Sequence, residues 1–205
     1  MTIRFHRQDL PDLANYNVDA VAIDTETLGL NPHRDRLCVV QISPGDGSAD
    51  VIQIDPGQKK APNLVKLLRD RSITKLFHFG RFDLAVLYKA FAAMPDPVFC
   101  TKIASRLTRT YTDRHGLKDI CNELLGVNLS KVQQSSDWAA QTLSPEQLEY
   151  AASDVLYLHR LRDVLVGRLA RDGRTKEADA CFRFLPTRSK LDLMGWAEED
   201  IFAHS

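Results

Sequence analysis

Three short motifs carry the acidic side chains of this sequence that are best placed for chemistry. They are Asp-Thr-Glu at 24–26, His-Phe-Gly-Arg-Phe-Asp at 78–83 and Tyr-Ala-Ala-Ser-Asp at 150–154. Their oxygen donors suit Mg²⁺ or Mn²⁺ rather than zinc. Two such ions held roughly 3.5–4 Å apart can clamp a phosphodiester while water attacks it in line. We therefore expect two ions bound by four carboxylates, those of Asp24, Glu26, Asp83 and Asp154.

Each motif taken alone also has a purely structural interpretation. Asp24 and Glu26 point to one face of a predicted strand, but such pairs also occur at solvated strand ends. Asp83 falls at an expected helix start, where a carboxylate is favoured electrostatically in any case. Tyr150 and Asp154 share a helix face, which equally describes an exposed acid above a packed ring. Taken together, the motifs favour the metal site, with Tyr150 orienting the attacking water.

The elements that must position these motifs follow from the apolar periodicity. Apolar runs bounded by turns predict strands at 18–24, 37–43 and 49–55, joined as a meander. After residue 55 the spacing of apolar residues changes from that of a strand to a mixture of helix and strand spacing, which predicts further elements of both kinds. These are a helix after Pro62, a β-prone segment at 73–79, and helices from about 82, over 101–109 and over 117–125.

The clearest helix begins at Ser144, which precedes a proline at the first helical position and Gln147 at the third. Apolar residues then recur every three or four positions through Leu165, and residues 171–174 end the pattern. Two short helical stretches are expected after it. We predict an α/β fold, with a mixed central sheet flanked by helices, in a single domain over residues 1–205.

The C-terminal part is rich in apolar side chains, and two arrangements are open for it. Helices from about residue 175 either pack back on the domain or form a subunit interface. The side chains concerned are Phe182, Phe184, Leu185, Leu191, Leu193, Met194, Trp196 and Phe202.

Bulk composition excludes several classes of protein. The chain has 205 residues, 44% apolar and 26% charged, which is ordinary for a globular protein. No apolar run approaches the roughly 20 residues that cross a membrane, and the N-terminus lacks a secretion-signal layout, so we expect a cytoplasmic protein. The four cysteines lack metal-binding spacing and are expected to be reduced thiols. The net charge of zero suggests a small nucleic-acid footprint.

In order and spacing, the three motifs resemble those of the DEDDy branch of the DnaQ-like 3′–5′ exonucleases, especially ribonuclease D. The segment at 129–138, LSKVQQSSDW, is similar to the stretch that precedes the third motif there. The resemblance covers roughly residues 15–170. It implies a ribonuclease H-like fold, dependence on divalent metal, attack from the 3′ end and release of 5′-mononucleotides. Phe79 is a departure, because relatives often have a small or amide residue there.

Only about 50 residues follow the last motif, too few for the helical RNA-binding domains of ribonuclease D. The chain therefore looks like the short stand-alone relatives of the nano-RNase C type. That resemblance implies a 3′-to-5′ exoribonuclease acting on short RNA, especially dinucleotides. It also implies a homo-oligomeric ring, for example an octamer.

Further residues near these motifs are candidates for substrate contacts. Leu28 and Leu30 lie in a loop where they either wedge between bases or cover the edge of the core. The basic residues of the 101–131 stretch either bind phosphate or form a solvated helical face. Trp138 shapes the pocket or belongs to the core or an interface. The complete candidate set is Thr25, Leu28, Leu30, His78, Arg114, His115, Lys118, Ser136 and Trp138.

Three other functions remain as alternatives. General ribonuclease D-like RNA trimming and DNA 3′–5′ exonuclease activity use the same motifs. A non-catalytic nucleic-acid-binding module should lack one of the acids, whereas all four and the tyrosine are present. A metal-free hydrolase has no support, because no G-x-S-x-G motif occurs.

Overall fold

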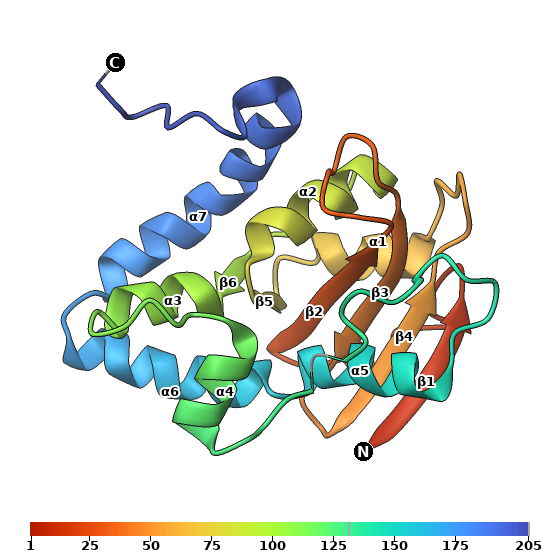
Figure 1. Ribbon diagram of the computed structural model, residues 1–205, viewed down its shortest axis with the longest axis horizontal. Coiled ribbons are helices and arrows are strands. Elements are labelled where there is room, and N and C mark those ends of the chain that lie inside the picture. The colour runs from red at the N-terminus through yellow and green to blue at the C-terminus, as the bar shows by residue number, and fades with distance from the viewer. Residues whose placement is uncertain (131, 205) are drawn as a thin grey trace.

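The computed structural model describes residues 1–130 and 132–204. Six strands form one mixed sheet in the order β1-β4-β3-β2-β5-β6 (Figure 1). The strands are β1 (Thr2–Arg7), β2 (Ala20–Thr27), β3 (Leu37–Ser43), β4 (Ser48–Gln53), β5 (Thr74–Phe77) and β6 (Val98–Cys100). This arrangement confirms the predicted α/β class with a mixed central sheet.

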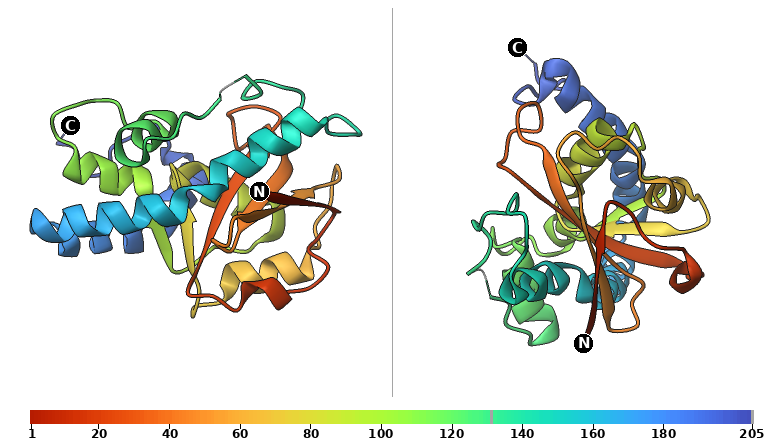
Figure 2. Two further views of the ribbon diagram at one scale, coloured as in Figure 1. Left: turned by 90° about the horizontal axis from the view of Figure 1, so that it is seen from below. Right: turned by 90° about the vertical axis from the view of Figure 1, so that its right-hand side faces the viewer.

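The helices follow the sheet along the chain. They are α1 (Pro62–Arg69), α2 (Gly80–Phe91), α3 (Thr101–Thr108), α4 (Leu117–Leu125), α5 (Pro145–Leu156), α6 (Leu158–Arg171) and α7 (Thr175–Leu191), with short turns η1 (Ala14–Tyr16) and η2 (Asp192–Trp196). Helix α5 lies across one face of the sheet and α1 covers the opposite face (Figure 2). None of the helices in the described ranges has the length and apolar character needed to span a bilayer.

The strand directions place the functional motifs at one edge of the sheet. Strands β2, β3 and β4 are antiparallel neighbours, as the predicted meander requires. Strands β2, β5 and β6 run parallel to one another. The carboxyl ends of parallel strands meet at the same edge of a sheet, where ligands commonly bind. The residues that follow these three strands are therefore brought together although they are far apart in sequence.

Burial in the core differs along the central strands. Strands β3 and β4 are buried along their whole length, although β4 includes the polar residues Ser48, Asp50 and Gln53. Strand β2 is buried from Ala20 to Ile23, and from there on Asp24, Glu26 and Thr27 are partly exposed while Thr25 stays buried. The acidic end of β2 therefore marks the point where the strand leaves the core.

Three sequence expectations need correction. The single helix expected from Ser144 to about residue 171 is two helices, because Tyr157 adopts a turn between α5 and α6. Helix α5 packs on the sheet whereas α6 packs mainly on α3 and α4, so the chain changes direction where the sheet ends. The two short C-terminal helices are instead one 17-residue helix, α7, with Pro186 inside it, followed by η2. Two strands had not been predicted: β1, which pairs in parallel with β4, and β6, which pairs in parallel with β5.

Candidate active site

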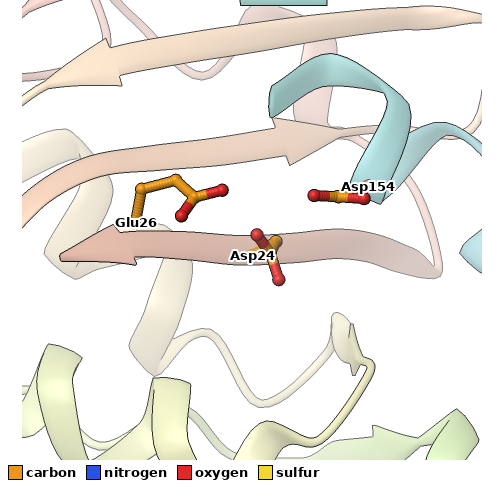
Figure 3. A group of neighbouring side chains, drawn as sticks. All are labelled: Asp24, Glu26 and Asp154. Carbon is orange, nitrogen blue, oxygen red and sulfur yellow. The ribbon is translucent and has the colours of Figure 1, made fainter. Parts of the chain in front are cut away.

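Three carboxylates from two elements meet at the end of β2. Asp24 and Glu26 extend from β2, and Asp154 extends from the last turn of α5 (Figure 3). One oxygen of each lies within 4.8 Å of the others. Gln41, the neighbour of Asp24 on β3, donates a hydrogen bond of 3.2 Å from its Nε2 to Asp24 Oδ2. Two distant motifs of the sequence therefore form one all-oxygen donor set.

The electrostatics of this carboxylate trio are unfavourable without a cation. Burial raises the pKa of Asp24 well above its usual value, and the charges of Asp83, Asp154 and Glu26 raise it further. Burial, followed by the charges of Asp154 and Asp83, raises the pKa of Glu26 to about 9. Neighbouring negative charges in a buried site oppose ionisation of each carboxyl group. The trio therefore either holds protons or needs a nearby positive charge. This donor set fits a hard divalent cation.

Asp83 lies beside the trio rather than within it. It is 4% exposed in the first turn of α2, and its Oδ1 accepts a hydrogen bond of 2.6 Å from Thr25 Oγ1. Burial raises its pKa to about 7, although the Thr25 hydroxyl opposes that shift. Thr25, predicted to contact substrate, therefore holds Asp83 in place. Because Asp83 raises the pKa of both Asp24 and Glu26, it belongs to the same electrostatic site.

Tyr150 lies one helical turn before Asp154 and is held from behind by Trp138. Its pKa is raised by burial and by the charges of Asp154, Glu26 and Asp24, so the phenol stays protonated and can donate. The rings of Trp138 and Tyr150 are 5.9 Å apart, and Trp138 is 3% exposed. Trp138 therefore packs in the core behind the tyrosine. Ser136, a further candidate, accepts a hydrogen bond from Gln147 at the start of α5.

The carboxylates open into a pocket of about 260 Å³ at the carboxyl-terminal edge of the sheet. Its wall contains acids, cations and apolar groups together, as the contact surface of a phosphate-bearing ligand requires. The lining residues are Asp24, His78, Phe79, Lys102, Gly116, Leu117, Lys118, Leu129, Ser130, Gln134, Tyr150 and Asp154.

His78 lines this pocket, as predicted from its place in the second motif. Its Nδ1 lies 2.9 Å from Thr101 Oγ1, and burial lowers its pKa to about 3, so the ring is neutral. The chain turns sharply after it, because a side chain at Gly80 would place its Cβ 2.8 Å from that of Phe77. The close approach of β5 and α2 thus accounts for a glycine in the second motif.

The other predicted substrate contacts differ in position. Lys118 lines the pocket, and Leu28 and Leu30 are exposed in the loop after β2. Arg114 is exposed and lies 3.8 Å from Asp119. His115 is buried and its Nδ1 is within 2.9 Å of Ser105 Oγ, so the structure does not bring it into the pocket wall. Lys131, part of the basic stretch, is outside the described residues.

Sequence reasoning missed several pocket residues. Phe79 was not assigned to the site, and Lys102 was named only as one of the basic residues of the 101–131 stretch, although each follows a strand that runs parallel to β2. Knowing the strand order would have identified both, because they lie at the same sheet edge as the acids. Leu129 and Gln134 reach the pocket from an irregular segment whose path has no periodic signal in the sequence.

Comparison with known proteins identifies the family of this chain. The 3′–5′ exonuclease family matches residues 10–170. Ribonuclease D of Gluconacetobacter diazotrophicus is 35% identical over 75% of this chain, which covers 39% of that protein. The solved structure of Brucella melitensis NrnC with bound Mg²⁺ is 81% identical over the full length of both chains, with a TM-score of 0.97. The same protein bound to pGG has a TM-score of 0.98 at 82% identity.

The two kinds of relative differ in length. This chain spans about two fifths of the curated ribonuclease D sequences that it matches, with 39% coverage of the first. Escherichia coli RNase D shares the fold with a TM-score of 0.77 at 28% identity, and this chain covers 50% of it. The NrnC structures are instead matched from end to end.

Proposed function

Because this chain belongs to the 3′–5′ exonuclease family and is of the nano-RNase C type, we propose that it is a 3′-to-5′ exoribonuclease acting on short RNA. Its substrates are oligonucleotides as short as dinucleotides, and its products are 5′-mononucleotides. The observation that carries the proposal is the convergence of Asp24, Glu26 and Asp154 within 4.8 Å, beside a pocket that also contains a tyrosine.

Divalent cations are the cofactors that this site would hold. The donor set consists of carboxylate oxygens only, which suits Mg²⁺ or Mn²⁺, and the NrnC relative is known with bound Mg²⁺. We assign one ion to the trio and a second to Asp24 and Asp83. Bound cations supply a water of lowered pKa and neutralise charge on the phosphate.

The remaining chemistry belongs to the side chains around the trio. Tyr150 keeps its proton because burial and three acids raise its pKa, so it orients the attacking water by hydrogen bonding. His78 is neutral and serves as a polar contact for the substrate rather than as a cation. Lys118 offers positive charge at the pocket wall for a phosphate, and exposed Arg114 is a second candidate at its rim.

Short substrates are favoured by the size and composition of the pocket. Its volume of about 260 Å³ is below the roughly 300–1,000 Å³ typical of pockets for whole drug-sized ligands. The NrnC relative binds pGG, a short nucleotide ligand. Leu28 and Leu30, which are 54% and 86% exposed, would pack against the bases. The zero net charge supports the same conclusion, because a long RNA footprint needs many cations.

A homo-oligomer is part of this proposal. Large apolar side chains remain exposed after α7, with Met194 at 67% and Phe202 at 77%. Exposed apolar groups that gather in one segment are typical of interfaces. Light scattering on the purified protein should therefore give a mass that is a multiple of 23.1 kDa, with a ring such as an octamer as the expected size.

The function is tested with 5′-labelled RNAs of two to about twenty nucleotides, with and without Mg²⁺. The proposal expects Mg²⁺-dependent release of mononucleotides and the highest rate on the dinucleotide. Even trimming of every length would support general ribonuclease D-like activity instead. DNA oligomers of the same sequence provide the comparison for sugar preference, and faster DNA cleavage would support the DNA exonuclease alternative.

A further inference from the structure

A second pocket adjoins the carboxylate pocket and shares one wall with it. It has a volume of about 230 Å³ and lies between α2, α3 and α7. Phe79 and Lys102 line both pockets and so form the wall between them. Ile103 and Leu185 provide an apolar floor on the far side of that wall. The proposed function leaves this second pocket without a role.

The second pocket is cationic, and two of its three cations, Lys102 and Arg106, have no acidic partner among the described residues. Lys102 and Arg106 are four residues apart on α3, so both extend from one helix face. Arg106 makes no hydrogen bond or ion pair with any residue that the structure describes. The lining contains no acid, and its third cation, Arg81, is already paired with Asp192 at 2.5 Å. Burial lowers the pKa of Lys102, and the like charge of Arg106 lowers it further.

Phe79 adds a flat apolar surface in an unusual conformation. Its φ of 67° and ψ of 38° are left-handed, a region that bulky residues rarely occupy and that costs about 1–3 kcal/mol. The ring is nevertheless 47% exposed, and Lys102 Nζ lies 4.3 Å from its centre. Core packing does not account for a strained backbone with a half-exposed ring. A ring and a cation on the rim of a nuclease-like pocket are suited to a nucleotide base and its phosphate.

We propose that this second pocket binds a nucleoside 5′-monophosphate, with the phosphate between Lys102 and Arg106 and the base against Phe79. The pocket is smaller than most whole-ligand sites, so part of the nucleotide stays in solvent. A nucleoside 5′-monophosphate is also the product of the reaction assigned to the neighbouring pocket. Only this identification of the ligand as the product rests on the proposed function. Because Phe79 and Lys102 border both pockets, a bound product there restrains the wall that the next substrate contacts.

Direct titration of guanosine 5′-monophosphate into the protein tests the site, in a buffer containing a chelator. In chelator the carboxylate trio has no metal ion with which to hold a phosphate, so binding under this condition reports the second pocket. We expect one bound nucleotide per chain. Arg106→Gln should weaken the binding by about tenfold or more, since hydrogen bonds to charged groups contribute about 1.5–3 kcal/mol, and Arg106→Glu should abolish it. Arg183→Gln is the matched control, because Arg183 is an exposed arginine on α7 outside the pocket.

Three results would overturn the proposal. They are no binding by the unaltered protein in chelator, equal binding by the Arg106 and Arg183 variants, and inorganic phosphate binding as tightly as the nucleotide. Dinucleotide hydrolysis in Mg²⁺ is measured separately and should be unchanged in Arg106→Gln at low product concentration. If the unaltered protein hydrolyses no dinucleotide, the proposed function is wrong. The titration in chelator would still decide whether the second pocket binds a nucleotide.

Discussion

Asp24 on β2 and Asp50 on β4 belong to the same sheet, but their surroundings have opposite charge. Asp50 is 2% exposed and accepts hydrogen bonds from Arg4 at 2.8 and 2.7 Å and from Tyr16 at 2.5 Å. His6 Nε2 lies 2.7 Å from the same carboxylate. Burial alone would raise the pKa of Asp50, yet these partners lower it. Asp24 has three carboxylates near it instead, and its pKa is raised.

The comparison shows that a buried acid is not by itself a functional signal. The Asp50 cluster satisfies its charge within the chain, and it ties edge strand β1 to β4. The negative charge of the Asp24 cluster has to be balanced by a bound ligand such as a cation. A buried carboxylate with cationic partners therefore indicates a structural role, and one with carboxylate partners indicates a ligand site.

The largest expected difference between the clusters is in turnover. Asp24→Asn removes a charge that the metal site needs, so we expect the rate to fall by about 10³-fold or more. The same change relieves repulsion among the acids, so the metal-free protein should be no less stable. Rates on a labelled dinucleotide and urea unfolding in chelator measure the two effects. Asp179→Asn, an exposed acid on α7, is the control, and a near-normal rate for Asp24→Asn would refute the site.

Asp50→Asn should show the reverse pattern. It leaves Arg4 and the Tyr16 hydroxyl without their charged partner, and breaking a buried ion pair costs about 3–5 kcal/mol. The free energy of unfolding should fall by that amount, as measured in urea. The rate per folded molecule should stay close to that of the unaltered protein. A large loss of rate without a loss of stability would remove the distinction between the two clusters.

A tyrosine beside each cluster sharpens the comparison. Tyr150→Phe should slow turnover by about 10²-fold, the lower end for removal of one positioned hydrogen-bond donor, with little change in stability or metal affinity. Tyr16→Phe should lower stability by about 1.5–3 kcal/mol, because its hydroxyl donates to a charged acceptor, and leave the rate unchanged. Thermal unfolding, metal titration and single-turnover rates of both variants test the contrast. Loss of metal affinity in Tyr150→Phe would contradict its role with water.

The most gradual effects concern pH, because each group changes stability by little per pH unit. In chelator, the raised pKa of Glu26, about 9, means that the folded state binds more protons than the unfolded chain between about pH 5 and 9. Its stability should therefore decrease as pH rises, by at most about 1.4 kcal/mol per pH unit for this group. Asp50 has a lowered pKa, so its contribution should be lost only below about pH 4. Urea unfolding midpoints measured from pH 3 to 9 would show both changes in stability. A midpoint that stays constant between pH 5 and 9 would contradict the raised pKa of Glu26.

The sequence predicts the local parts of this fold better than the long-range parts. Strands β2, β3 and β4 and the capping box at Ser144 follow from short-range patterns, and the capping box is present in the structure. Strand β1 was missed although Ile3 and Phe5 alternate with polar residues, because its charged face is accounted for only by contacts with Asp50 on β4. The four acids could be named from their motifs. The hydrogen bond from Thr25 to Asp83 and the burial of His115 depend on contacts that no local pattern encodes.

The turn at Tyr157 has a consequence for how this chain can vary. Because α5 ends at Leu156, Asp154 lies in the final turn, where the backbone carbonyls add negative potential that a cation offsets. Each residue of a helix turns the side-chain direction by about 100°. One residue inserted or deleted between Tyr150 and Asp154 would rotate the acid away from β2 while the rest of α5 still covered the sheet. Length variation within these five residues should therefore be lethal to the site.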